Sequence, residues 1–173
     1  KHCEKRYDQE SRGRNSLRES SNLRYGHHVD KVAQTKEDGT YEDVNMIYWD
    51  IRFSNLCNLS CRTCGTWFSS NWYDDQVRLW GDPGHDKVTY AGTTKMDAYE
   101  QLIEYLPMVE QIYFAGGEPL IMEEHYKILQ ALIDIGKADE VRLLYNTNFT
   151  RQSYKKLNVF DIWPEFKRIF GGN

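Results

Sequence analysis

The clearest hydrophobic pattern in the chain is an alternation with a period of two that begins near Met46. Polar and apolar residues alternate along this segment, and the apolar positions are Ile47, Trp49, Ile51 and Phe53. A period of two is typical of a strand whose side chains face opposite sides of a sheet. The pattern therefore predicts a first strand, which ends at a loop rich in cysteine.

Two helical patterns follow, and each precedes another short apolar run. The first spans about 95–106, ends at Pro107 and has apolar residues at i, i+3, i+4 and i+7. The second ends at Gly136 and contains Tyr126, Leu129, Leu132 and Ile133. The runs 111–115 and 141–145 predict strands, and 166–170 predicts a fourth strand after a unit over 153–163. Repeated strand–helix–strand units predict a parallel sheet with right-handed crossovers.

An aromatic segment after Gly65 predicts one more helix, with Ser69, Ser70 and Asn71 as candidate N-caps. The sequence Gly81-Asp82-Pro83-Gly84 ends it. We expect its apolar residues to lie in the core, because large aromatic side chains dominate core burial. The alternative is that they shield a metal centre from water. These residues are Trp67, Phe68, Trp72, Tyr73, Val77, Leu79 and Trp80.

Composition divides the chain near residue 45. The first 36 residues hold nine Lys and Arg against five Asp and Glu, whereas the whole chain of 173 residues has a net charge of −4. We therefore expect a polar, basic N-terminal arm over 1–45 and a folded domain over 46–173. Charge runs are usually solvated, so a solvated arm is favoured over a phosphate-binding face built from Arg12, Arg14, Arg18 and Arg24. Nucleic acid is a possible partner that is not favoured.

Membrane and secreted proteins are poor fits to this sequence. No apolar run approaches the ~20 residues needed to cross a bilayer. Four cysteines, three of them clustered, do not form a disulfide framework in a chain of 173 residues. We expect a soluble, cytoplasmic protein in a reducing compartment, with no membrane partner. Cys3 stands apart from the cluster, and we expect a free thiol there.

Three of the four cysteines fall within eight residues, spaced Cys57-x3-Cys61-x2-Cys64, directly after the first predicted strand. Three thiolates on a short loop can hold three irons of a cubane cluster and leave the fourth iron open. An open coordination position is what a catalytic metal needs. The alternative is a zinc-binding interaction module, although zinc prefers cysteine pairs separated by a longer spacer and four protein ligands.

This cysteine loop resembles the cluster loop of the radical S-adenosylmethionine (radical SAM) superfamily. The resemblance implies a [4Fe-4S] cluster bound by Cys57, Cys61 and Cys64, with S-adenosylmethionine chelated to the open iron. It further implies an iron–sulfur enzyme of the oxidoreductase type, in which reductive cleavage of the sulfonium gives a 5′-deoxyadenosyl radical that abstracts hydrogen. In such an enzyme the cofactors carry the chemistry and the protein positions them.

The second anchor of the resemblance is Gly116-Gly117-Glu118-Pro119, which follows Ala115 at the end of the second predicted strand. In the superfamily such a turn receives the methionyl amino group of S-adenosylmethionine. Glycines let the backbone approach a ligand, and a carboxylate can accept hydrogen bonds from an ammonium group. The proline ends the strand.

The third predicted strand ends in Asn146-Thr147-Asn148, which is similar to a Thr-Asn-Gly strand end in the superfamily. These residues are candidates for contact with the cofactor or the substrate. Thr63 stands where many members have a bulky residue near adenine, so it is a candidate for backbone contacts only. No pair of His or Glu residues has a spacing that indicates acid–base catalysis, and His85 and His125 are expected to be surface or packed residues.

The fold class that these patterns predict is α/β, a parallel (β/α) partial TIM barrel with its first three to four units present. In such barrels the site lies at the carboxyl ends of the strands. A full barrel needs ~250 residues, so we expect the chain to be the front part of a longer enzyme.

The segment from Cys3 to Asn22 is similar to a leader in the twitch/SPASM-type, peptide-modifying branch. A peptide is therefore the first choice of substrate, other small molecules remain open, and a nucleoside or RNA is the alternative. The resemblance also implies an electron donor such as a flavodoxin or ferredoxin.

Overall fold

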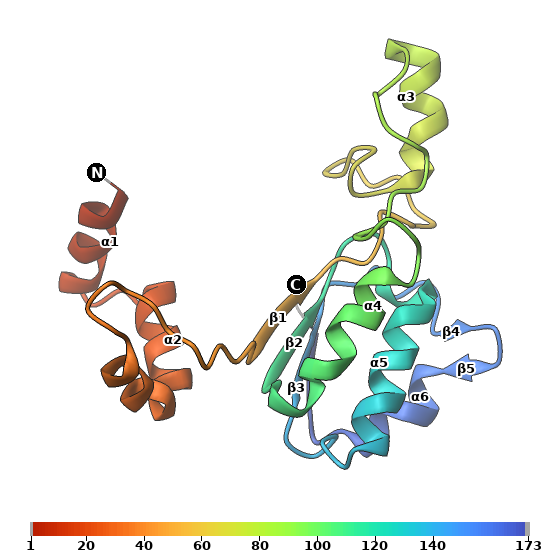
Figure 1. Ribbon diagram of the computed structural model, residues 1–173. Coiled ribbons are helices and arrows are strands. Elements are labelled where there is room, and N and C mark those ends of the chain that lie inside the picture. Colours follow the sequence, from red (N-terminus) through yellow and green to blue (C-terminus); the bar gives the residue numbers. More distant parts are fainter. Residues whose placement is uncertain (1, 172–173) are drawn as a thin grey trace. The chain divides into compact units, whose positions relative to one another are not determined.

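The computed structural model describes residues 2–171. The chain forms two compact units, Lys1–Val44 and Asn45–Asn173. Figure 1 shows the helices of the first unit in red and orange and the sheet and helices of the second from orange to blue.

The first unit is helical, and local hydrogen bonds account for much of its structure. At the start of its second helix, Ser16 Oγ accepts the Glu19 N–H at 3.1 Å and the Glu19 carboxylate accepts the Ser16 N–H at 3.1 Å, which is a capping box. Among the side chains described in this unit, only Ser16 is buried. The elements are α1 (His2–Ser11), α2 (Leu17–Tyr25) and the 3-10 helix η1 (Gly26–Gln34).

The second unit is built on a four-stranded parallel sheet with the order β1-β2-β3-β6. Trp49, Ile112, Leu143 and Ile169 are aligned across it, one from each strand. The sequence therefore predicted the parallel α/β arrangement and its four strands correctly. The strands are β1 (Tyr48–Ile51), β2 (Gln111–Phe114), β3 (Arg142–Tyr145) and β6 (Arg168–Gly171).

The connecting helices α4 and α5 lie on one face of this sheet (Figure 1). The core sits between them and the strands, where Trp49, Ile112 and Leu143 pack with Leu106 and Leu129. The positive φ of 75° at Gly136 ends α5 as the sequence predicts. The helical elements are η2 (Ser70–Trp72), α3 (Tyr73–Trp80), α4 (Asp97–Leu102), η3 (Ile103–Met108), η4 (Pro119–Ile121), α5 (Glu123–Asp134), α6 (Val159–Ile162) and η5 (Trp163–Glu165).

The other face of the sheet is polar and aromatic. Asp50 and Arg168 are exposed, and Phe170 keeps 44% of its surface in solvent. Asp50 pairs with Arg52 at 2.7 Å, and the Arg142 guanidinium lies 4.0 Å from the centre of the Phe170 ring. Strands buried on both faces read as continuous apolar runs, so this alternation marks one packed face and one face without an apolar cover.

The expectation that the aromatic segment after the cysteine loop belongs to the core is wrong. Its helix forms as predicted, since Ser69 caps η2 and Gly81 ends α3 with φ 88°. However, Trp67 is 62% and Trp80 72% exposed, and no residue of α3 is buried. In Figure 1 α3, in yellow-green, projects beyond the end of the sheet.

Two helical predictions need smaller corrections. Pro107 does not end the helix after residue 95, because α4 passes into η3 and Pro107 lies inside that 3-10 turn. The unit over 153–163 begins with a short hairpin, β4 (Ser153–Tyr154) and β5 (Leu157–Asn158), before α6. None of the helices in residues 2–171 has the length and apolar content required to cross a membrane.

Candidate functional site

The three sequence motifs lie at the carboxyl ends of adjacent strands. The cysteine loop follows β1, Gly116-Gly117-Glu118-Pro119 follows β2, and Asn146-Thr147-Asn148 follows β3. Because β1, β2 and β3 are parallel neighbours, these ends meet along one edge of the sheet. The topology therefore gathers the motifs, which are up to 91 positions apart in the chain, as between Cys57 and Asn148.

A buried asparagine fixes both sides of the cysteine loop. Asn55 is 3% exposed and directly precedes the loop. Its Nδ2 donates to the carbonyl oxygens of Thr66 at 2.7 Å and Lys87 at 3.1 Å, and its Oδ1 accepts the Thr89 N–H at 2.9 Å. One side chain thus joins the entry of the loop, its exit and the segment after α3.

Further hydrogen bonds hold the loop backbone. Ser70 Oγ accepts the Cys57 N–H at 3.2 Å, and Trp72 Nε1 donates to the Cys61 carbonyl oxygen at 2.9 Å. The Cys64 N–H donates to the same Cys61 oxygen at 3.0 Å, which closes a tight turn between the second and third cysteines. The serines and the tryptophan that follow the loop therefore set its conformation.

The three thiols form a donor set that fits an iron–sulfur cluster. All are free, with Cys57 and Cys64 half-buried and Cys61 exposed. A cubane takes one thiolate on each of three irons.

The glycine turn touches the beginning of the cysteine loop through its backbone. The Gly117 N–H donates to the Ser54 carbonyl oxygen at 3.0 Å, and the Glu118 N–H donates to the Leu56 oxygen at 2.8 Å. A Cβ on Gly117 would lie 2.6 Å from the Leu56 carbonyl carbon, and one on Gly116, where φ is 103°, would lie 2.9 Å from the Ser54 oxygen. Only glycine fits at these two positions.

The Glu118 side chain is directed into the protein. It is fully buried, and its Oε1 accepts the Leu120 N–H at 3.0 Å and the Thr147 hydroxyl at 2.6 Å. Its Oε2 accepts the Asn148 N–H at 2.7 Å. The carboxylate that the resemblance assigns to a cofactor ammonium thus joins the end of β2 to the end of β3 in this structure. The half-buried Gly116 and Gly117 are the parts of the turn that solvent reaches.

Asn148 links the end of β3 to the cysteine loop. Its Nδ2 lies 3.1 Å from Asn58 Oδ1 and 3.7 Å from Cys57 Sγ, and Asn58 Nδ2 donates to Thr150 Oγ1 at 2.8 Å. Hydrogen bonds to cysteine sulfur are among the factors that tune the potential of an iron–sulfur cluster. An asparagine at this position can therefore orient Cys57 and modulate a metal bound there.

The other predicted site residues differ in exposure. Thr63 is exposed within the cysteine loop, and Asn146 is exposed at the end of β3. Ala115 and Pro119 are buried, and the Ala115 N–H donates to the Ile51 oxygen, which continues the sheet ladder. Thr147 is half-buried and bonds to the Glu118 carboxylate. Ala115, Pro119 and Thr147 thus support the site from the protein interior.

Sequence reasoning missed Asn55 and a small hollow beside the glycine turn. The hollow has a volume of about 130 Å³ and is lined by Arg52, Trp67, Phe68, Tyr90 and Gly116, among others. Asn55 precedes the first cysteine by two positions, and a polar residue at a strand end was its only signal. The hollow had none, because residue 90 reaches Ser54 through a bridge that local patterns do not reveal.

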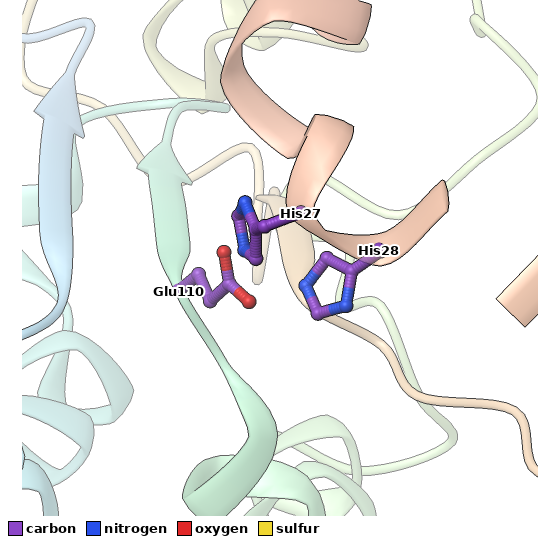
Figure 2. A group of neighbouring side chains, drawn as sticks. All are labelled: His27, His28 and Glu110. Atoms are coloured by element: carbon purple, nitrogen blue, oxygen red, sulfur yellow. The ribbon is translucent and has the colours of Figure 1, made fainter. Parts of the chain in front are cut away.

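Histidines contribute little to this edge of the sheet. Figure 2 shows His27 and His28 on η1 of the first unit, with ring centroids 4.2 Å apart. Glu110, also labelled in Figure 2, precedes β2 in the second unit, and its N–H donates to the Ile47 oxygen at 2.8 Å. The His85 ring packs against the Trp67 ring at a tilt, with centroids 4.1 Å apart, as expected for a histidine packed at the surface.

Three free thiols, the two glycines of the turn and an amide donor therefore share the edge formed by the carboxyl ends of β1, β2 and β3. Comparison of the chain with protein-family models, with curated proteins and with solved structures gives no match.

Proposed function

We propose that the chain is a radical SAM enzyme whose [4Fe-4S] cluster is held by Cys57, Cys61 and Cys64. The observation that carries the proposal is the meeting of the three motifs at adjacent strand ends. The spacing of the cysteines suggested the family, and the hydrogen bonds from Asn148 and the glycine turn to the cysteine loop support a shared site.

The strand order favours a partial barrel over a doubly wound sheet. In the order β1-β2-β3-β6 each new strand is added on the same side, so right-handed crossovers leave all helices on one face. A doubly wound sheet reverses direction and covers both faces with helices. The uncovered face here carries the Asp50–Arg52 ion pair and Arg142, which suits a barrel interior that binds a polar substrate.

When bound, the cluster and S-adenosylmethionine supply a reducing electron and a 5′-deoxyadenosyl radical for hydrogen abstraction. The residues of the chain would provide the surroundings of that chemistry. The three thiolates would hold the iron, and Asn148 Nδ2 would direct an N–H toward Cys57 Sγ. Gly116 and Gly117 would allow close approach to the backbone of the turn. Glu118 would act as a positioning residue behind it.

The proposal is tested by anaerobic iron–sulfur reconstitution and electron paramagnetic resonance of the reduced protein. We expect a reduced-cluster signal that changes when S-adenosylmethionine is added. The signal should be lost in Cys61→Ala and kept in Cys3→Ala, because Cys3 is an exposed thiol on α1. One bound zinc without iron, or an unchanged signal in Cys61→Ala, would overturn the proposal and favour the zinc-binding module.

A peptide is the substrate class that we propose first, with a nucleoside or RNA as the second candidate. The leader-like sequence favours the peptide, whereas the arginines of the first unit favour the nucleic acid. Two of those arginines are engaged by carboxylates, because Arg12 pairs with Asp8 at 3.0 Å and Arg18 pairs with Glu10. Fewer charges are then left for phosphates. RNA binding that weakens steeply between 50 and 200 mM salt would reverse this preference.

A reduced flavodoxin or ferredoxin would serve as the electron donor. Cys61 is the exposed cysteine of the three, so electron transfer to a metal on this loop has a route from the surface.

A further inference from the structure

Asn58, Asn148 and Thr150 form a closed ring of hydrogen bonds between the cysteine loop and the end of β3. Asn148 Nδ2 donates to Asn58 Oδ1 at 3.1 Å, and Asn58 Nδ2 donates to Thr150 Oγ1 at 2.8 Å. The Thr150 hydroxyl then donates to Asn148 Oδ1 at 2.7 Å. Each side chain gives one hydrogen bond and accepts one inside the ring, so a rotation of any member breaks two bonds. The ring therefore fixes the positions of both amides.

The backbone sets the direction in which the Asn148 amide faces. The Thr150 N–H, which can only donate, lies 3.0 Å from Asn148 Oδ1. The atom opposite it must be the carbonyl oxygen of the amide, and the NH₂ group is consequently turned toward the cysteine loop. The Asn148 N–H is in turn held by the Glu118 carboxylate at 2.7 Å. Asn148 is thus fixed both at its backbone and at its amide.

The two hydrogens of this NH₂ group have different acceptors. Asn58 accepts one of them inside the ring, and the Cys57 sulfur, 3.7 Å from Nδ2, accepts the other. In the described part of the chain, the sulfur atoms of Cys61 and Cys64 have no comparable donor. Asn148 therefore acts on one of the three thiols and makes it chemically different from the other two.

A hydrogen bond to a cysteine sulfur favours the reduced state of an iron–sulfur centre. Reduction adds negative charge, part of which resides on the thiolate sulfurs, and an N–H donor stabilises that charge. The buried carboxylate of Glu118, which is bonded to the Asn148 backbone, acts in the opposite sense because like charges repel. The Asn148 amide thus offsets an unfavourable charge behind the loop.

We propose that Asn148 is a positioning residue that raises the reduction potential of the cluster through Cys57, with its amide held in place by Asn58 and Thr150. This inference rests on the proposed function, because it concerns how easily the cluster of that site takes up its electron. With Asn148 in place, the site accepts an electron from a weaker reductant than it would without this donor.

The test is a redox titration of the reconstituted full chain, in which electron paramagnetic resonance measures the reduced cluster. Asn148→Leu keeps the approximate shape of the side chain and removes the N–H donor. At the midpoint potential of the wild type, we expect a ratio of reduced to oxidised cluster about threefold to tenfold lower in this variant, the effect of one hydrogen bond. This ratio corresponds to ~30–60 mV for one electron. Asn148→Asp turns a carboxylate oxygen toward the sulfur and should lower the ratio further.

Asn71→Leu is the matched control. Asn71 Nδ2 donates to Ser60 Oγ at 2.9 Å, so this variant also removes an asparagine amide bonded to the cysteine loop, but one that does not reach a sulfur atom. Its ratio should equal that of the wild type. Thr150→Val removes one of the two donors to Asn148 Oδ1 and keeps the backbone N–H, so its ratio should lie between those of the wild type and Asn148→Leu. Iron content and thermal unfolding verify that each variant folds and holds its cluster.

The order of the potentials separates tuning from a structural role. General loosening of the loop would lower the iron content and the thermal midpoint without placing Asn148→Asp below Asn148→Leu in potential. Equal ratios in the wild type and Asn148→Leu, or an equal decrease in Asn71→Leu, would overturn the inference and leave the proposed function standing. Failure of the wild type to form any cluster would overturn both.

Discussion

Glu118→Gln tests whether the buried carboxylate acts on the fold or on a ligand. Oε1 accepts two hydrogen bonds, from Leu120 and Thr147, and Oε2 accepts the Asn148 N–H at 2.7 Å. A glutamine keeps the larger number of bonds if its oxygen replaces Oε1. Its NH₂ group then faces the Asn148 N–H, so two donors meet. Loss of one charge-assisted bond, with a buried donor left unpaired, costs about 2–3 kcal/mol.

Urea unfolding of the protein without cofactors measures this cost. We expect the free energy of unfolding to fall by that amount, and the Asn148 amide to exchange faster with solvent. Glu124→Gln is the matched control, since Glu124 is 1% exposed and its Oε1 has no hydrogen-bond partner among the described residues. If Glu118→Gln leaves the free energy of unfolding unchanged and abolishes S-adenosylmethionine binding, a purely structural role for Glu118 is wrong. The carboxylate would then bind the ligand.

Three further predictions follow from burial and backbone contact. Gly117→Ala should lower the free energy of unfolding by at least about 2 kcal/mol in urea titrations, because its Cβ meets the Leu56 backbone, whereas Gly65→Ala, with open space at Cβ, should not. Burial lowers the pKa of His125 to about 3. Because the neutral form of His125 is the one that the folded state accommodates, its contribution to the free energy of unfolding is complete above pH ~6.5 and decreases as the pH falls. The expected loss is about 2 kcal/mol at pH 5, and His125→Gln should remove this pH dependence. Trp80→Ser should change the thermal midpoint little, because Trp80 is 72% exposed; a loss as large as that expected for a core tryptophan would show that α3 is packed.

The strands could be predicted from the sequence because burial of one face imposes a period of two. Trp49, Ile51 and Phe53 are all nearly buried, whereas Asp50 and Arg52 between them are exposed. A parallel sheet then follows from the helices between the strands, and the sheet gathers the strand-end motifs. For this reason the positions of the cysteine loop and of the glycine turn at the same edge could be predicted as well.

The exposure of α3 could not be predicted. An apolar pattern shows that residues are suited to burial, but it does not show whether another part of the chain packs against them. Trp67 and Trp80 are residues of the kind found in cores, yet both are mostly exposed. The same limit applies to Glu118. Its partner Asn148 is 30 positions away, so the direction of the carboxylate depends on how two strand ends meet.

The buried carboxylate also indicates how the site is held together. Glu118 binds Thr147 and Asn148 at the end of β3, and Asn148 in turn reaches Asn58 and Cys57. The glycine turn reaches the same loop through Leu56. Three strand ends thus form one hydrogen-bonded structure, and such preorganisation reduces the ordering needed when a site binds a ligand. Glu118 could contact a ligand if it were exposed. Its hydrogen bonds to Thr147 and Asn148 explain why it is buried beneath the glycine turn instead.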